Sequence, residues 1–239
     1  ILAALCIIPV IFVFMISISA EESLATYGYK FLPKLFSLSA YEFLWNEKGT
    51  ILQALFISIL VTVLGTLIGL LLTTTMGYVL SRRDYKLKGF FTWVVFIPMI
   101  FNGGLVASYV INTQVLGLRD SIWALILPLA VSSFNVIISK TFFRTTIPDS
   151  IIESAKIEGA SHLDIFIRIV MPISKPVLAT LSLFLSFGYW NDWFQASLYI
   201  NDKSLISLQA LLNNMQSNIQ YLASNPTAGL SMQQYLNQM

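Results

Sequence analysis

The residue types best suited to binding chemistry are concentrated in one short stretch of the chain. This stretch combines flat aromatic rings with an amide and a carboxylate, in the order Trp190, Asn191, Asp192, Trp193 and Phe194. Aromatic faces stack on the C–H faces of a sugar ring, while amide and carboxylate groups hydrogen-bond its hydroxyls. The stretch is therefore a candidate sugar-contact site. The alternative is an aromatic belt at a membrane interface, which leaves the acidic Asp192 without a role.

A second candidate is a break in an otherwise apolar segment, at Asn102, Gly103 and Gly104. Irregular backbone at membrane depth is tolerated where it lines a cavity, because unpaired backbone groups then find water or polar partners. These residues are thus expected beside a substrate pathway. A plain packing kink is the other interpretation.

Groups for catalysis are scarce. The chain has a single histidine, His162, and a single cysteine, Cys6, which excludes paired-histidine metal sites and disulfide frameworks. It has no H-E-x-x-H motif and no G-x-x-x-x-G-K-[ST] phosphate loop. We therefore predict that the chain is not an enzyme, holds no metal, and does not hydrolyse ATP itself.

The composition predicts the elements that position these residues. Of the 239 residues, 56% are hydrophobic and 11% are charged, with a mean hydropathy of +0.74. Soluble domains carry roughly 25% charged residues, so this chain cannot cover a water-facing surface. The net charge of +2 also gives no sign of a nucleic-acid partner. We expect an all-α integral membrane protein that contacts lipid, forming one domain over residues 1–239.

Five segments are long and apolar enough to be membrane spans, since a crossing helix needs about 20 apolar residues. They are Ile1–Ile18, Thr50–Leu80, Phe90–Ile111, Ser121–Ser139 and Pro176–Leu198. The second contains Gly65, Gly69 and Gly77, which predict close helix packing. The prediction is a polytopic helical bundle.

The basic residues predict its orientation. Nine of the 14 fall in two loops, which hold Arg82, Arg83, Lys86 and Lys88, and then Lys140, Arg144, Lys156, Arg168 and Lys175. Cytoplasmic loops are enriched in Lys and Arg, so both loops are expected in the cytoplasm. The N-terminus is then cytoplasmic, and the tail from Tyr199 to Met239 lies outside.

The second basic loop, about residues 141–175, has a pattern of its own. Thr146, Pro148 and Asp149 predict a helix start, and Ile151, Ile152 and Ala155 form its apolar stripe. Gly159 is expected to end this helix. A second helix follows from the Ser161 and Asp164 cap to Pro172, with a second apolar stripe at Ile165, Phe166 and Ile169. Such a helix–Gly–helix unit suits a partner's groove or the membrane face.

This unit resembles the EAA loop of ATP-binding-cassette (ABC) importer permeases. The matching residues are Glu153, Ser154, Ala155, Glu158, Gly159, Ala160, Ile169 and Pro172. The family pattern has Ala where this chain has Ser154, Asp where it has Glu158, and Leu where it has Met171. In that family the loop forms coupling helices that insert into a cleft on the ATP-binding subunits, and the resemblance implies the same role here.

The resemblance extends along most of the chain. The segment from Ser121 to Pro128 and the Trp190–Trp193 stretch are similar to the carbohydrate branch of these permeases, and the Asn102 break fits the group that imports complex oligosaccharides. Such permeases end with one more helix, which this sequence lacks, so we expect a sixth span to be missing by truncation. The other interpretation is that this subunit lacks its last span. Two alternatives to a carbohydrate importer remain open: an ABC permease for an amino acid or a polyamine, and an ion-coupled secondary transporter.

The resemblance also implies partners. It predicts a subunit in the bacterial plasma membrane that pairs with a second homologous permease, a dimer of ATP-binding subunits and an extracytoplasmic solute-binding protein. ATP and Mg would be bound by the ATPase, and this chain would hold no cofactor.

Overall fold

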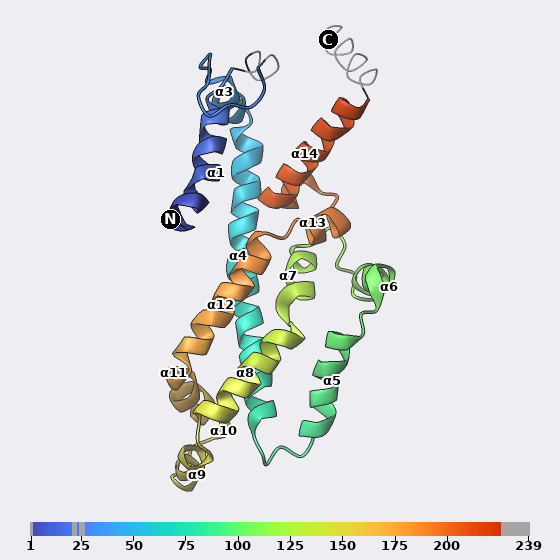
Figure 1. Cartoon of the computed structure of the whole chain (residues 1–239). Helices are drawn as coiled ribbons and strands as arrows, with labels where there is room; N and C mark the ends of the chain where they lie inside the picture. The colour runs from blue at the N-terminus through green and yellow to red at the C-terminus, as the bar shows by residue number, and fades with distance from the viewer. Residues whose placement is uncertain (1, 21–22, 24–26, 226–239) are drawn as a thin grey trace. The chain divides into compact units, whose positions relative to one another are not determined.

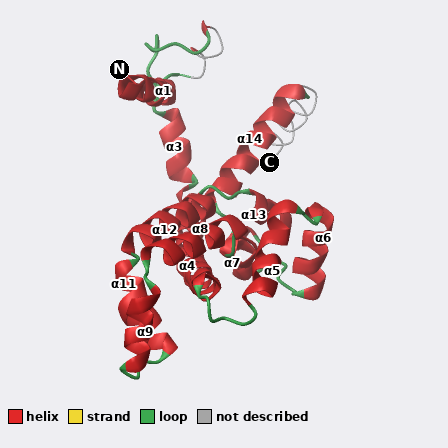
Figure 2. Cartoon of the chain, turned by 60° about the horizontal axis from the view of Figure 1, so that its bottom comes forward, coloured by secondary structure: helices red, strands yellow, loops and turns green. Residues whose placement is uncertain are grey.

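The computed structural model describes residues 2–20, 23 and 27–225. The described part consists of helices and loops, without strands (Figures 1 and 2). It divides into two compact units, Ile1–Gln53 and Ala54–Met239. The all-α prediction is confirmed, while the expectation of one domain over 1–239 stays a prediction.

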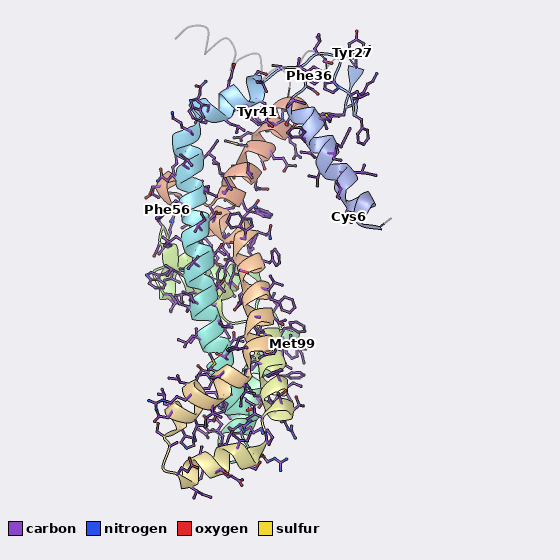
Figure 3. The ribbon with its side chains drawn as sticks, turned by 90° about the vertical axis from the view of Figure 1, so that its left-hand side faces the viewer. Cys6, Tyr27, Phe36, Tyr41, Phe56 and Met99 are labelled. Carbon is purple, nitrogen blue, oxygen red and sulfur yellow. The ribbon has the colours of Figure 1, made fainter. Side chains whose placement is uncertain are left out.

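The first unit holds α1 (Leu2–Ser17) and α3 (Ser39–Asn46). Between them, Ser19 and Phe36 form an isolated antiparallel bridge, and the hydroxyls of Ser17 and Tyr41 lie 2.9 Å apart. Cys6 is exposed on α1 (Figure 3). These contacts fold the segment after α1 back on itself.

Helix α4 (Lys48–Ser81) has 34 residues, and other helices of the second unit pack along it. It matches the predicted span at 50–80. Its glycines allow close packing, as predicted: a Cβ at Gly69 would lie 2.8 Å from the carbonyl oxygen of Ala130, and one at Gly77 would lie 2.9 Å from the amide of Lys140. On another side, apolar side chains such as Phe56 project outward (Figure 3). A lipid-facing helix has this distribution.

The predicted span at 90–111 is broken in the structure. Helix α5 (Lys88–Ile100) stops at Phe101, and α6 (Gly104–Val110) continues into the π-helical turn η1 (Ile111–Val115). Gly104 has φ +82°, which glycine adopts without strain, and its amide donates to Asn102 Oδ1 at 2.9 Å. The predicted break at Asn102–Gly104 is confirmed.

The remaining spans are bent pairs. Helices α7 (Ile122–Ala130) and α8 (Ser133–Thr146) meet at 48°, shortly after Pro128, which removes a backbone donor from α7. The segment His162–Ile173 meets α12 (Lys175–Trp190) at 84°. Helix α12 ends at Trp190, before the predicted Leu198.

Between Thr146 and α12 lie α9 (Asp149–Ile157), α10 (His162–Asp164), η2 (Ile165–Val170) and α11 (Met171–Ile173). After α12 come α13 (Phe194–Tyr199), η3 (Lys203–Leu205) and α14 (Leu208–Ser224). The last part of the predicted external tail, from residue 226 onward, lies outside the described residues.

In the described part, one helix is long and apolar enough to cross a membrane, or up to three spans if each bent pair counts as one. Cys6–Ser17 and Lys88–Ile100 are shorter apolar helices. Each of the five predicted spans therefore contains an apolar helix.

Two apolar clusters lie at different levels of the second unit. One packs α4 against α7, α12 and α13 around Ile57, Leu125 and Tyr189. The other packs the end of α4 against α8, α9 and η2 around Tyr78, Phe143 and Ile165. Helices α9 and α13 accordingly lie at different heights along α4 (Figure 1).

Candidate functional site

The first candidate site is the helix–Gly–helix unit after α8, which we define as residues 149–173 and call the bracket. Its first helix begins later than the predicted start at Thr146. Thr146 ends α8. The residue before α9 is Pro148, which has an extended backbone (ψ 140°) and makes no side-chain capping hydrogen bond. Proline lacks an amide hydrogen and cannot be a donor in either helix, so α8 stops here. Asp149 lies in the first turn of α9, as predicted.

Gly159 ends α9 with a complete C-terminal turn. The amide of Ala160 donates to the carbonyl of Ala155, and the amide of Gly159 donates to that of Lys156, each at 3.0 Å. These are the two bonds of a Schellman motif, which places the residue after the cap in the left-handed region. Gly159 has φ +84°, so its predicted role as the helix stop is confirmed.

The second half of the bracket begins at Ser161, as predicted. Its hydroxyl accepts from the amide of Asp164 at 3.1 Å and donates to the Asp164 carboxylate at 2.6 Å. The predicted end at Pro172 is wrong: Pro172 lies inside α11, and the 84° bend comes at Ser174. A proline is tolerated in the first turn of a helix, so α11 can include it.

The apolar stripe of α9 is turned toward its own chain. Ile152 and Ala155 are only 4% and 7% exposed, buried against Phe143, Ile165 and Tyr78. We predicted that this stripe would enter a partner's groove, and that prediction is wrong for these two residues. Folding α9 back on α8 and η2 covers them first. The apolar residues left for a partner are Ile151, Ile157, Leu163, Ile167 and Ile173, which are exposed.

Charged residues fasten the bracket to the end of α4. Asp149 accepts from Arg82 Nη1 at 3.3 Å and lies 3.4 Å from Arg83 Nε. Arg82 is buried, and it also donates to the carbonyl of Phe143 at 3.1 Å. These contacts join α4, α8 and α9 at one point.

A second ion pair lies further along α9. Lys156 Nζ is 2.7 Å from Asp84 Oδ2. This hydrogen bond lowers the pKa of Asp84 below its ordinary value, against a smaller opposite effect of burial. We call the Arg82, Arg83 and Asp84 contacts with α9 the clamp. Sequence reasoning counted these basic residues for topology only and missed the clamp.

The remaining predicted coupling residues fall into two groups. Glu153, Ser154, Glu158 and Pro172 are exposed, whereas Ala160 and Ile169 are half-buried against the cluster around Phe143. The structure thus brings the whole motif into one bracket, with its acidic residues facing outward.

The second candidate site is a cavity of about 420 Å³ in the second unit, formed by α6, η1, α7 and α13. Its walls are Asn102, Gly104, Leu105, Ser108, Ile111, Asn112, Pro128, Phe194, Gln195, Leu198 and Tyr199. We call it the outer cavity. Its size lies within the roughly 300–1,000 Å³ of ligand pockets.

The predicted substrate residues divide around this cavity. Asn102 and Phe194 line it, and Gly103 is next to two lining residues. Trp190, Asn191, Asp192 and Trp193 do not line it. The amide of Asn191 donates to the carbonyl of Phe187 at 2.9 Å, and the Asp192 carboxylate accepts from the backbone amide of Gln195 at 3.3 Å. These two side chains therefore shape the turn between α12 and α13.

Apart from Asn102, sequence reasoning missed the polar wall of the outer cavity. Asn112 donates to the Tyr199 hydroxyl at 2.9 Å, and Tyr199 stacks on Tyr109 with the ring centroids 5.9 Å apart. Asp120 holds the end of α13, because it accepts from the backbone amides of Asn201 and Asp202. These bonds lower the pKa of Asp120. The available signal for the polar wall was the group of polar residues Ser108, Asn112, Thr113 and Gln114 within a largely apolar stretch.

Comparison with known proteins settles the class. Residues 65–232 match the family model of the binding-protein-dependent transport system inner membrane component. The chain belongs to this family. Permease subunits of ABC importers make up the family, so this permease is a membrane transport subunit whose class has no enzymatic activity of its own, as predicted.

Its relatives agree with this assignment. Protein LplC of Bacillus subtilis (strain 168) is 41% identical over 89% of the permease and 71% of LplC. The polygalacturonan/rhamnogalacturonan transport system permease protein YtcP of the same organism is 40% identical over 89% of the permease and 73% of YtcP. A crystal structure of a bacterial ABC transporter involved in the import of the acidic polysaccharide alginate matches with a TM-score of 0.81 and 28% identity, over 94% of the permease and 81% of that chain.

Proposed function

We propose that the permease carries oligosaccharides or other carbohydrates across the bacterial plasma membrane, driven by ATP hydrolysis on separate subunits. The observation that carries the proposal is the likeness to YtcP and to the alginate importer, whose names state carbohydrate cargoes. The outer cavity supports it, because its walls combine aromatic and amide groups. ATP and Mg are assigned to the ATP-binding subunits, and no cofactor to this chain.

The bracket is the proposed docking site for one ATP-binding subunit. Its exposed apolar residues, above all Ile157, can be buried in a groove, and the outward Glu153 and Glu158 can accept from donors at its rim. Because the clamp fastens α9 to α4, a displacement of the bracket by the ATPase moves the end of α4 as well. A second permease and an extracytoplasmic binding protein complete the proposed assembly.

In the proposed orientation, the clamp is cytoplasmic and the outer cavity lies in the outer half of the membrane. Lys86 and Lys203 are both exposed and suit a labelling test. In a Cys6→Ser background, a membrane-impermeant maleimide should label Lys203→Cys but not Lys86→Cys in intact cells. The reverse pattern contradicts the orientation.

The function is tested on the complex purified from native membranes and reconstituted in lipid. Its subunits should include an ATP-binding protein, and oligosaccharides with the binding protein should stimulate ATPase activity, whereas amino acids and polyamines should not. Stimulation by an amino acid or a polyamine alone would contradict the carbohydrate assignment.

Gly159 tests the bracket within the same complex. No atom lies within 4 Å of a Cβ built at Gly159, so a side chain there meets only the backbone penalty of φ +84°. That penalty is about 1–2 kcal/mol for Gly159→Val and smaller for Gly159→Asn, because Asn tolerates this region. We expect the Val variant to lose sugar-stimulated ATPase activity and the Asn variant to keep most of it. Equal activity in both variants contradicts a coupling role for this turn.

A further inference from the structure

The polar groups of the outer cavity are neutral. Its lining includes three amides and two hydroxyls, which belong to Asn102, Asn112, Gln195, Ser108 and Tyr199. None of the described residues that line it carries a charge. The cavity lining can therefore hydrogen-bond a ligand but provides no charged side chain to pair with an ionised group on it.

These groups supply both donors and acceptors. Asn112 uses its amino group on Tyr199, which leaves its carbonyl oxygen as an acceptor and leaves the Tyr199 hydroxyl free to donate elsewhere. Asn102 uses its oxygen on the amide of Gly104, which leaves its amino group as a donor. Each hydroxyl group of a sugar ring can both donate and accept a hydrogen bond, so a sugar can pair with these donors and acceptors.

Gln195 adds an acceptor that the fold does not use. Its Oε1 atom is buried at the cavity wall and accepts no hydrogen bond from any residue that the structure describes. Burying an amide oxygen without a donor is costly. The terminal torsion of a glutamine is broad, so its amide can turn toward a ligand without strain.

Phe194 adds a stacking surface. Its ring is exposed at the cavity and meets Trp193 edge-on, with centroids 5.9 Å apart and planes at 88°. An edge contact leaves a face of the Phe194 ring available. The C–H face of a pyranose or furanose can pack on such a face.

We infer that the outer cavity binds one uncharged sugar unit of the cargo, with Phe194 as the stacking surface and Gln195 and Asn112 as hydrogen-bonding groups. The inference rests on the proposed function and narrows it. Uronate carboxylates are normally held by Arg or Lys, often through two parallel hydrogen bonds. The absence of such a residue from the described lining disfavours the acidic sugars that the names of YtcP and the alginate importer imply for those proteins.

The test uses two probes with one carbon skeleton, trigalacturonate and its fully methyl-esterified, uncharged form, together with neutral arabinotriose and maltotriose. Leu198 lines the cavity and is half-buried, so Leu198→Cys in a Cys6→Ser background reports occupancy by its rate of maleimide labelling. Ser197→Cys, which is exposed and outside the lining, is the control. In the purified complex, at least one neutral probe should slow labelling of the Leu198→Cys variant but not of the Ser197→Cys variant, and trigalacturonate should slow neither.

The Gln195→Met variant tests sugar binding separately from the stability of the fold. Gln114→Met, at an exposed position of η1, is the control variant. Gln195→Met removes an acceptor that has no partner among the described residues, so the melting temperature should stay equal or rise. Protection by the neutral probe should need about tenfold more sugar, because a lost buried hydrogen bond costs about that factor.

Three results on protection by sugar overturn the inference: protection by trigalacturonate and not by its ester, protection by no neutral probe, or no effect of Gln195→Met on protection. Absence of labelling of the Leu198→Cys variant without sugar also overturns it, because a partner subunit then closes the cavity. A complex that imports carbohydrate yet gives one of these results refutes this inference alone. A complex without an ATP-binding subunit, or without any response to carbohydrate, refutes the proposed function.

Discussion

Asp149→Asn is the sharpest test of the clamp. The carboxylate of Asp149 pairs with Arg82 at 3.3 Å and Arg83 at 3.4 Å, and it is a residue through which α9 is held to the end of α4. An amide keeps the shape and removes the charge. The variant therefore weakens the link between the bracket and the spans without altering any apolar contact.

The two ion pairs differ in strength. The Arg83 side chain is 81% exposed, so its pair contributes between 0 and about 1 kcal/mol. The Arg82 side chain is 10% exposed, and breaking a fully buried pair costs about 3–5 kcal/mol. Asp149 is itself 46% exposed, and Arg82 keeps its bond to the carbonyl of Phe143. We expect a loss of about 1–2 kcal/mol, which lowers the melting temperature by about 2–8 °C in a chain of this size.

The assay measures the melting temperature, ATPase activity and sugar import of the reconstituted complex. We expect Asp149→Asn to hydrolyse ATP while importing severalfold less sugar per ATP, because the bracket moves with less of α4. Asp164→Asn is the matched control: Asp164 also lies in the first turn of a bracket helix and pairs with Arg168 at 3.6 Å, but both side chains are exposed. Equal losses in the two variants, or full coupling in Asp149→Asn, would refute the reasoning.

Two further predictions concern packing and pH. Gly77→Ala should destabilise the second unit by about 1–3 kcal/mol, because the new methyl group would lie 2.9 Å from the amide of Lys140, whereas Gly89→Ala, with no atom within 4 Å, should be neutral or stabilising; melting temperatures of the two variants decide this. The pKa of Asp84 is lowered by Lys156, so this ion pair stabilises the fold above the ordinary pKa near 4 and is lost as the pH falls through the lowered value. Lys156→Met should therefore lower the melting temperature slightly at pH 7, and a difference from wild type that persists unchanged at pH 3 would contradict the role of the ion pair.

Much of the bracket could be predicted from its sequence because its signals are local. Asp149 in the first turn, Gly159 at the stop and Ser161 at the second start act through backbone groups close to themselves in the chain. The direction of the apolar stripe could not be predicted. Periodicity shows that Ile152 and Ala155 share a face, but whether that face meets its own chain or a partner depends on how α8 and η2 fold back over α9.

The substrate residues show the same limit. The sequence places Trp190 to Trp193 together, yet the structure uses Asn191 and Asp192 to form the turn between α12 and α13 and assembles the cavity from residues as far apart as Asn102 and Tyr199. The sequence by itself determined the membrane character, the apolar helices and the form of the bracket, because hydropathy and helix ends depend on neighbouring residues. Only the tertiary structure decided the clamp and the outer cavity, because ion pairs and cavity walls depend on where helices distant in the chain meet.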